Sequence, residues 1–354
     1  MLLEGLQLPL TAPFYPDGRL NLAKLEHNAA RYSKTPVAGL VALSDSGEPT
    51  MLSDDETRDV LRSVSDASAP SKVLMAGVSR DSVAGTLDLA EAAAKFRYDA
   101  VLVKQPTFFR TRAPGIDAKA LLTYFRLVAD RSPLPVVLYC TASDRGGSLP
   151  VEMVIELAGH PQIVGLLDSG DGQGRWKAIK DGTAGLKREA TVTAVFAAVT
   201  GRMKPGSENG AEGLVLADAL TDGGAALAIT PAKIVVKTRK KSVGFQMLAG
   251  RTSGMLEALQ GGAVGAMPAF AASAPQVCYE VLAAWKDGDE GLANEKQVRL
   301  QGVAKRVEEE LGVAGIKFGC DLNGYFGGRP RLPLLPLTGE ERAEIEALMQ
   351  GLRN

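Results

Sequence analysis

Apolar and polar residues follow two alternating patterns along the chain. Short runs rich in Val, Leu, Ala and Gly are each followed by a longer segment in which apolar residues recur every three or four positions. The first pattern is typical of strands buried on both faces, and the second of helices that cover them. We therefore expect strands at 5–11, 38–44, 72–78, 98–104, 135–140, 162–168, 244–249 and 262–267, with helices between them at 22–34, 53–68, 83–96, 117–130, 150–159 and 253–260.

Eight such repeats predict an α/β fold, a (β/α)8 TIM barrel of parallel strands. The barrel is expected over residues 1–271, and three more helical stretches follow as a C-terminal helical extension over 272–354. Local signals agree: Ser53 and Glu56 have the spacing of a capping box at a helix start. The extension helices are expected at 274–287, 290–312 and 339–352, packed beside the barrel.

The stretch 172–243 departs from the alternation of strands and helices, because it holds 72 residues where one helix would suffice. We interpret it as an insertion between strands 6 and 7, partly strand-like. The simplest interpretation of its basic end, Lys237 to Lys241, is a solvent-exposed face. A contact with an anionic ligand or with another subunit is the more specific alternative.

Composition and charge narrow the range of possible partners and cellular locations. The chain has 354 residues, of which 45% are hydrophobic, and its 40 basic and 41 acidic residues give a net charge of −1. This balance argues against a nucleic-acid partner. The sequence contains no apolar run of about 18–20 residues for a membrane span and no secretory leader pattern. Three separated cysteines, Cys140, Cys278 and Cys320, indicate reduced thiols and a cytoplasmic location.

The sequence offers few residues that could bind a metal ion or a cofactor. The chain has only two histidines, which excludes a zinc site built on several of them. We expect no metal and no organic cofactor, and a small-molecule ligand as the main partner.

A series of motifs in chain order resembles the dihydrodipicolinate synthase / N-acetylneuraminate lyase family of class I aldolases. Most of the matching segments lie at predicted strand ends, and the similarity covers nearly the whole chain except 172–243. They are Thr11 to Gly18, Ser44 to Glu48, Leu52 to Glu56, Ala76 to Ser79, Pro106 to Phe109, Leu138 to Cys140, Val164 to Ser169 and Arg329 to Leu334.

The resemblance implies an imine-forming lysine at the end of strand 6, and this chain has Leu167 there. Leucine has no nucleophile, and Asp168 and Ser169 fix the register beside it. Ordinary pyruvate imine chemistry is therefore not expected from this position. A second departure is Asp45, where relatives hold the substrate carboxylate: two unit charges about 4 Å apart repel by about 4 kcal/mol at an effective dielectric of 20. The alternative is that Asp45 points away, which leaves its N–H usable.

The resemblance also suggests roles for the residues that remain. Tyr139 matches the strand-5 tyrosine that acts as a general acid/base, and Ser46 keeps a hydroxyl in the carboxylate-binding pair. Phe108 stands where relatives often have a relay tyrosine. Arg145 is a candidate for the substrate carboxylate, with a loop salt bridge as the alternative.

Three further residues lie at strand ends on the same face. Gly47 is expected to serve the tight turn after strand 2, and Glu48 to have a structural role. Asp168 is expected to contact a polar ligand or to cap the next helix.

Another lysine can stand in for the missing one. Lys104 ends strand 4 on the catalytic face, and the alternation of Val101, Leu102 and Val103 before it predicts that its side chain points inward. A rim lysine or a partner of Asp45 or Asp168 is the simpler interpretation.

Three hypotheses follow. The chain is a divergent aldolase or lyase acting on a small keto-acid or sugar-acid-like metabolite, a non-catalytic ligand-binding or structural paralogue, or an aldolase whose imine lysine has moved to Lys104. The resemblance further implies a homodimer or homotetramer, with subunits meeting at Pro106 to Phe109 and at the helices after strand 8.

Overall fold

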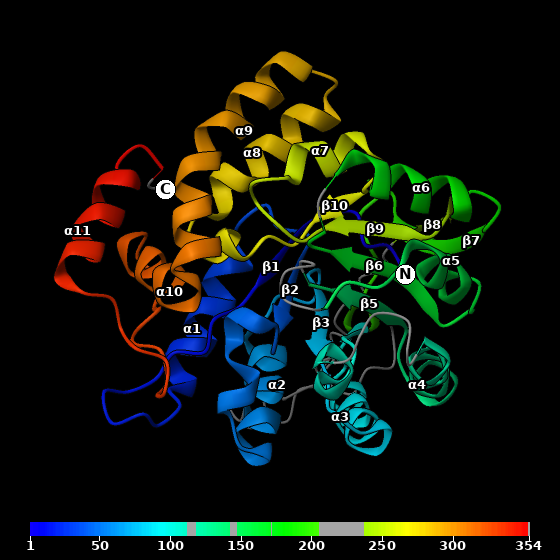
Figure 1. Cartoon of the computed structure of the whole chain (residues 1–354), viewed down its shortest axis with the longest axis horizontal. Helices are drawn as coiled ribbons and strands as arrows, with labels where there is room; N and C mark the ends of the chain where they lie inside the picture. The colour runs from blue at the N-terminus through cyan, green and yellow to red at the C-terminus, as the bar shows by residue number, and fades with distance from the viewer. Residues whose placement is uncertain (112–117, 142–146, 171, 205–236, 353–354) are drawn as a thin grey trace, which may run out of the picture.

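The computed structural model describes residues 1–111, 118–141, 147–170, 172–204 and 237–352. Eight parallel strands close into a barrel in the order β1-β10-β9-β6-β5-β4-β3-β2, which confirms the predicted TIM barrel (Figure 1). The barrel strands are β1 (Gly5–Pro9), β2 (Gly39–Ala42), β3 (Val73–Gly77), β4 (Ala100–Val103), β5 (Val136–Cys140), β6 (Ile163–Asp168), β9 (Gln246–Ala249) and β10 (Gly265–Ala266).

Amphipathic helices cover the outside of the barrel. The capping box expected at Ser53 and Glu56 is present, with each side chain bonded to the backbone of the other residue. The helices are α1 (Leu22–Tyr32), α2 (Asp54–Ala67), α3 (Val83–Lys95), α4 (Ala118–Arg131), α5 (Val151–Ala158), α6 (Gln173–Thr183) and α7 (Met255–Gln260).

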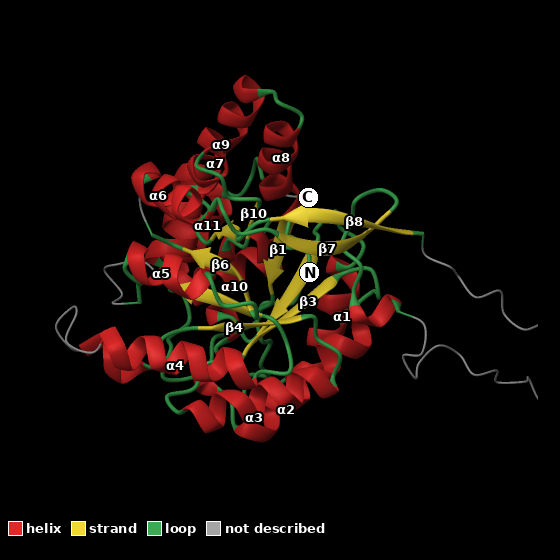
Figure 2. Cartoon of the chain, turned by 90° about the vertical axis from the view of Figure 1, so that its right-hand side faces the viewer, coloured by secondary structure: helices red, strands yellow, loops and turns green. Residues whose placement is uncertain are grey.

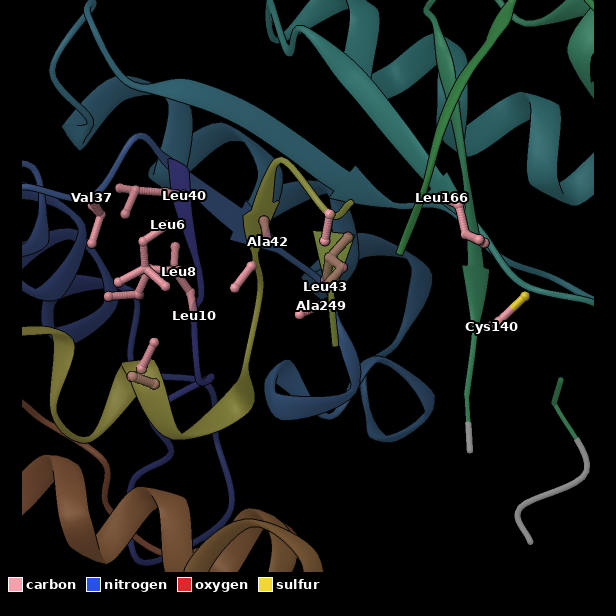
Figure 3. Packing of buried hydrophobic residues seen from close by; sticks show 14 of the residues in the cluster. Leu6, Leu8, Leu10, Val37, Leu40, Ala42, Leu43, Cys140, Leu166 and Ala249 are labelled. Atoms are coloured by element: carbon pink, nitrogen blue, oxygen red, sulfur yellow. The ribbon is translucent and has the colours of Figure 1, made fainter. Parts of the chain in front are cut away.

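Alternation along the strands separates two apolar layers. One set of side chains points outward and packs under the helices, as Figure 3 shows for Leu6 and Leu8 of β1 and Leu40 of β2 (Figure 3). The other set fills the barrel interior with small and branched side chains. The interior is therefore a packed core.

The stretch expected as an insertion contains α6 and then an antiparallel hairpin, β7 (Arg188–Thr193) and β8 (Thr238–Val243). Ala190 and Val192 of β7 are buried against Leu2, so the hairpin lies beside the N-terminus (Figure 2). Part of the basic run follows the surface of β8, where Lys240 pairs with Glu189 at 3.4 Å.

The C-terminal extension lies on one flank of the barrel (Figure 1). It consists of α8 (Pro275–Lys286), α9 (Glu290–Ala304), a π-helical turn (Lys305–Glu310), α10 (Gly312–Leu322) and α11 (Gly339–Leu348). The sequence pattern predicts three helices, and α10 is the additional one. Among the described residues, no helix has the length and apolar character needed to cross a membrane.

Candidate active site

Three polar side chains meet at the carboxyl ends of β2, β4 and β5. The Lys104 amine forms an ion pair with Oδ1 of Asp45, and the Tyr139 hydroxyl donates a hydrogen bond of 3.0 Å to Oδ2 of the same carboxylate. The Lys104 amine also lies 5.0 Å from the centre of the Tyr139 ring. One carboxylate thus joins an amine and a phenol, the groups that nucleophilic and acid–base catalysis require.

Strand geometry explains why Lys104 reaches this place. Ala100 and Leu102 of β4 point into the barrel, and Lys104 follows at the same parity two residues later. Its backbone N–H is fixed by a 2.8 Å hydrogen bond to the Ser79 hydroxyl at the end of β3. Of the two alternatives for Asp45, the structure shows the one in which its carboxylate lines the cavity, where Lys104 neutralises it.

Two cavities open on either side of this cluster, and Asp45, Tyr139 and Thr141 line both. The larger, of about 540 Å³, lies over the ends of β2, β3 and β4. The smaller, of about 180 Å³, lies toward β1, β6, β9 and β10. The larger cavity is lined by Leu43, Asp45, Pro49, Thr50, Leu52, Asp54, Gly77, Ser79, Arg80, Asp81, Lys104, Gln105, Pro106, Thr107, Tyr139 and Thr141.

Leu167 occupies the barrel interior. Its side chain is 1% exposed and belongs to the inward-facing cluster with Val137 and Leu248, directly across from Tyr139 in the β5–β6 pairing. The strand-6 position thus supplies packing beneath the tyrosine. The amine beside Tyr139 comes instead from Lys104 at the end of β4, which lines the larger cavity.

The loop after β2 carries the other predicted residues. Ser46 is buried in a short 3-10 turn, η1 (Asp45–Gly47), and lines the smaller cavity. The Gly47 N–H bonds the Ser44 carbonyl at 2.9 Å, and a Cβ on Gly47 would lie 3.2 Å from the Leu10 carbonyl oxygen, so the residue serves the tight turn.

Glu48 anchors this loop to the C-terminal extension. It adopts a left-handed conformation (φ 52°), and its fully buried carboxylate accepts hydrogen bonds from the Lys317 amine at 2.5 Å and the Arg331 N–H at 2.8 Å. Burial lowers the pKa of Lys317, and the negative charge of Glu48 opposes that shift. The structural role expected for Glu48 therefore has a specific form, a buried ion pair that holds the Asp45 loop in place.

The remaining predicted residues lie outside the two cavities or outside the described residues. Asp168 points outward, where its carboxylate accepts hydrogen bonds from Arg175 at 2.5 Å and from the Gly170 N–H at 2.7 Å. Phe108 is 49% exposed and contacts the ring of Phe109. Arg145 falls in 142–146, outside the described residues.

Sequence reasoning missed several residues in the walls of the two cavities. Arg80, at the end of β3, lines the larger one, and Glu308 and Glu309 of the π-helical turn line the smaller one. Glu308 accepts hydrogen bonds from the hydroxyl and N–H of Thr252 and from the Phe270 N–H, while burial raises the pKa of its carboxyl. The position of Arg80 at a strand end was a usable signal, whereas the glutamates lie far away in the sequence.

Comparisons with known proteins agree with this architecture. The sequence model of the protein family described as the dihydrodipicolinate synthetase family matches residues 2–182 and 224–352 of this chain. A 4-hydroxy-tetrahydrodipicolinate synthase of Acidiphilium cryptum is 27% identical and aligned over 99% of this chain and 98% of its own length. An L-threo-3-deoxy-hexylosonate aldolase of Hypocrea jecorina is also 27% identical, over 99% and 95%.

Solved structures show the same fold. Dihydrodipicolinate synthase DapA-2 from Bacillus anthracis superposes with a TM-score of 0.75 at 20% identity over the full length of both chains. The prophage protein YagE of E. coli K12, solved in complex with pyruvate, superposes with a TM-score of 0.75 at 22% identity over 99% of each chain. The barrel, the strand-end motifs and the family match together show that this chain belongs to the dihydrodipicolinate synthetase family.

Proposed function

We propose that this protein acts as an aldolase or lyase on a small 2-oxo acid or sugar acid, whose carbonyl lies in the larger cavity against Lys104, Asp45 and Tyr139. The observation that carries the proposal is the shared carboxylate: Asp45 holds the Lys104 amine and the Tyr139 hydroxyl together in the wall between the two cavities. Relatives named as aldolases support this reaction class.

Each group has a role in this scheme. The Tyr139 hydroxyl donates a proton to the substrate's carbonyl oxygen as negative charge develops there, and Asp45 takes up or returns protons beside it. Lys104 supplies the positive charge that faces the same oxygen. The imine at strand 6 has no part, because Leu167 is packed in the barrel core.

Binding measurements test the proposal. We expect calorimetry to show that pyruvate or a six-carbon 2-oxo sugar acid binds, and that K104M and Y139F each weaken binding. The matched control is K177M, since Lys177 is the next lysine after Leu167 and is 78% exposed beside Asp181. Equal affinity in wild type, K104M and Y139F, or no binding of either acid, contradicts the proposal.

Two assays distinguish this proposal from the other two hypotheses, a non-catalytic paralogue and an aldolase with its imine on Lys104. Binding without release of pyruvate from any 2-oxo sugar acid would identify a non-catalytic paralogue. The third hypothesis, an imine on Lys104, is favoured by the position of that amine in the cavity beside Tyr139. In this mechanism the amine adds to the carbonyl carbon and water leaves, so borohydride in the presence of pyruvate would fix an adduct on Lys104. Retained binding with no adduct would exclude the imine.

We also propose that the chain is cytoplasmic and forms a homodimer or homotetramer. The three cysteines are free thiols, which suits a reducing compartment. The exposed ring of Phe108 supports a subunit contact at Pro106 to Phe109. A monomer in sedimentation at micromolar concentration would contradict the oligomer.

A further inference from the structure

A second cation, Arg80, lines the larger cavity together with Lys104. Arg80 follows Ser79 at the end of β3, and its Nη1 donates a 3.0 Å hydrogen bond to the Ser79 carbonyl. The hydroxyl of the same serine accepts the Lys104 N–H. Both residues are thus held around Ser79, and both line the cavity.

The Arg80 guanidinium keeps donors for a ligand. Within the described part of the chain, its side chain makes that one hydrogen bond and one ion pair, which is 3.9 Å long and leads to Asp54, a residue whose side chain is 83% exposed. The neighbouring arginine on α2 is engaged more closely, since Arg58 contacts Asp88 at 2.5 Å. A guanidinium has five N–H donors in a planar fork that matches a carboxylate.

A 2-oxo acid needs such a group. Its carboxylate is bonded directly to the reacting carbonyl carbon, so it must lie near Lys104 and Tyr139. The loop after β2, which the resemblance assigns to carboxylate binding, presents to the cavity the Asp45 carboxylate, which already takes the positive charge of Lys104. Asp81, a further acid in the wall, accepts hydrogen bonds from the Thr107 N–H and hydroxyl. The substrate anion therefore requires a cation away from Asp45.

We infer that Arg80 binds the substrate carboxylate in the larger cavity. This inference rests on the proposed function and names a residue that sets its substrate class. It places the carboxylate on the β3 side of the cavity and the carbonyl between Lys104 and Tyr139.

The experiment compares pyruvate with pyruvamide, its uncharged amide, by calorimetry on the full chain. We expect R80Q to weaken pyruvate binding about ten- to hundred-fold, because a charge-assisted hydrogen-bond pair is removed, and to leave pyruvamide binding unchanged. R58Q is the matched control and should bind both as the wild type does. D54N removes the competing carboxylate and should tighten pyruvate binding about two- to three-fold, an effect that damage to the fold would not produce.

Each outcome decides the question. Unchanged pyruvate affinity in R80Q overturns the inference, while weaker binding in K104M alone leaves the proposed function standing. Equal weakening of both ligands in R80Q also overturns it, because the effect would then not depend on the carboxylate. If the wild type binds neither compound nor any larger 2-oxo acid, the proposed function fails and this inference fails with it.

Discussion

Removing the amine of Lys317 tests how the C-terminal extension holds the catalytic face. K317M leaves the Glu48 carboxylate, which is fully buried, with the Arg331 N–H as its one remaining hydrogen-bond donor among the described residues. It also removes the hydrogen bond of 2.9 Å from Lys317 to the Arg329 carbonyl. Breaking one side of a buried ion pair costs about 3–5 kcal/mol, which is a large part of the roughly 5–15 kcal/mol that stabilises a typical domain.

The double variant separates the effect of a buried charge from the effect of changed packing. E48Q/K317M buries no charge, and the amide oxygen introduced by E48Q can still accept from Arg331. We therefore expect it to recover most of the free energy of unfolding, to within about 1–2 kcal/mol of the wild type. K240M is the surface control: Lys240 and Glu189 are each 68% exposed, and their pair should contribute less than about 1 kcal/mol.

The assay is chemical denaturation of the four chains, followed by far-UV circular dichroism and tryptophan fluorescence. Coincident transitions would validate the comparison of free energies. A decrease below about 1 kcal/mol in K317M, or a double variant as unstable as the single one, would refute the reasoning that this ion pair fixes the Asp45 loop.

Three further changes have expected outcomes. L167A should lower the free energy of unfolding by about 2–5 kcal/mol through an interior cavity, and a decrease below about 1 kcal/mol in denaturation would show that this layer is loosely packed. E56Q should cost about 1–2 kcal/mol at pH 7, since it breaks a doubly hydrogen-bonded pair with Arg331. The guanidinium lowers the pKa of Glu56 from its ordinary 4.5, so this stabilisation exists above that pH and disappears as the pH falls through the folded-state value; a gap between E56Q and the wild type that does not shrink as the pH falls below 4.5 would contradict it. R202M should destabilise the chain by about 2 kcal/mol or more, because it removes the hydrogen bonds that the guanidinium donates to the carbonyls of Ser65, Ser68, Ala69 and Lys72. Thermal unfolding of R202M unchanged from wild type would show that the hairpin region does not support α2.

The barrel was predictable because its signal is local and repeated. Each buried run is followed by a helical pattern, and the capping box at Ser53 fixes a helix start to the residue. Helix α10 was missed because Gly312, Gly315 and Gly319 weaken its local pattern, while its packing on the barrel decides its conformation. Gly319 shows this directly, since a Cβ there would lie 2.6 Å from the Ser273 hydroxyl.

The candidate site was predictable where strand parity decides direction. Lys104 shares the inward parity of Ala100 and Leu102, and the structure places its amine in the cavity. The same rule applied to β6 would have placed Asp168 outside, because it directly follows the inward Leu167. Contacts between distant segments were beyond this reasoning: nothing near Glu48 in the sequence indicates that its charge partner lies 269 residues away.

The central claim is that the chemistry of this barrel has its centre at β4 and β5, with Lys104, Asp45 and Tyr139, and not at β6. A crystal structure of the chain soaked with pyruvate tests it most directly. The account predicts ligand density in the larger cavity, within hydrogen-bonding or covalent distance of the Lys104 amine and beside the Tyr139 hydroxyl. Density confined to the smaller cavity beside the end of β6, with Lys104 still paired to Asp45 and untouched by the ligand, would contradict it.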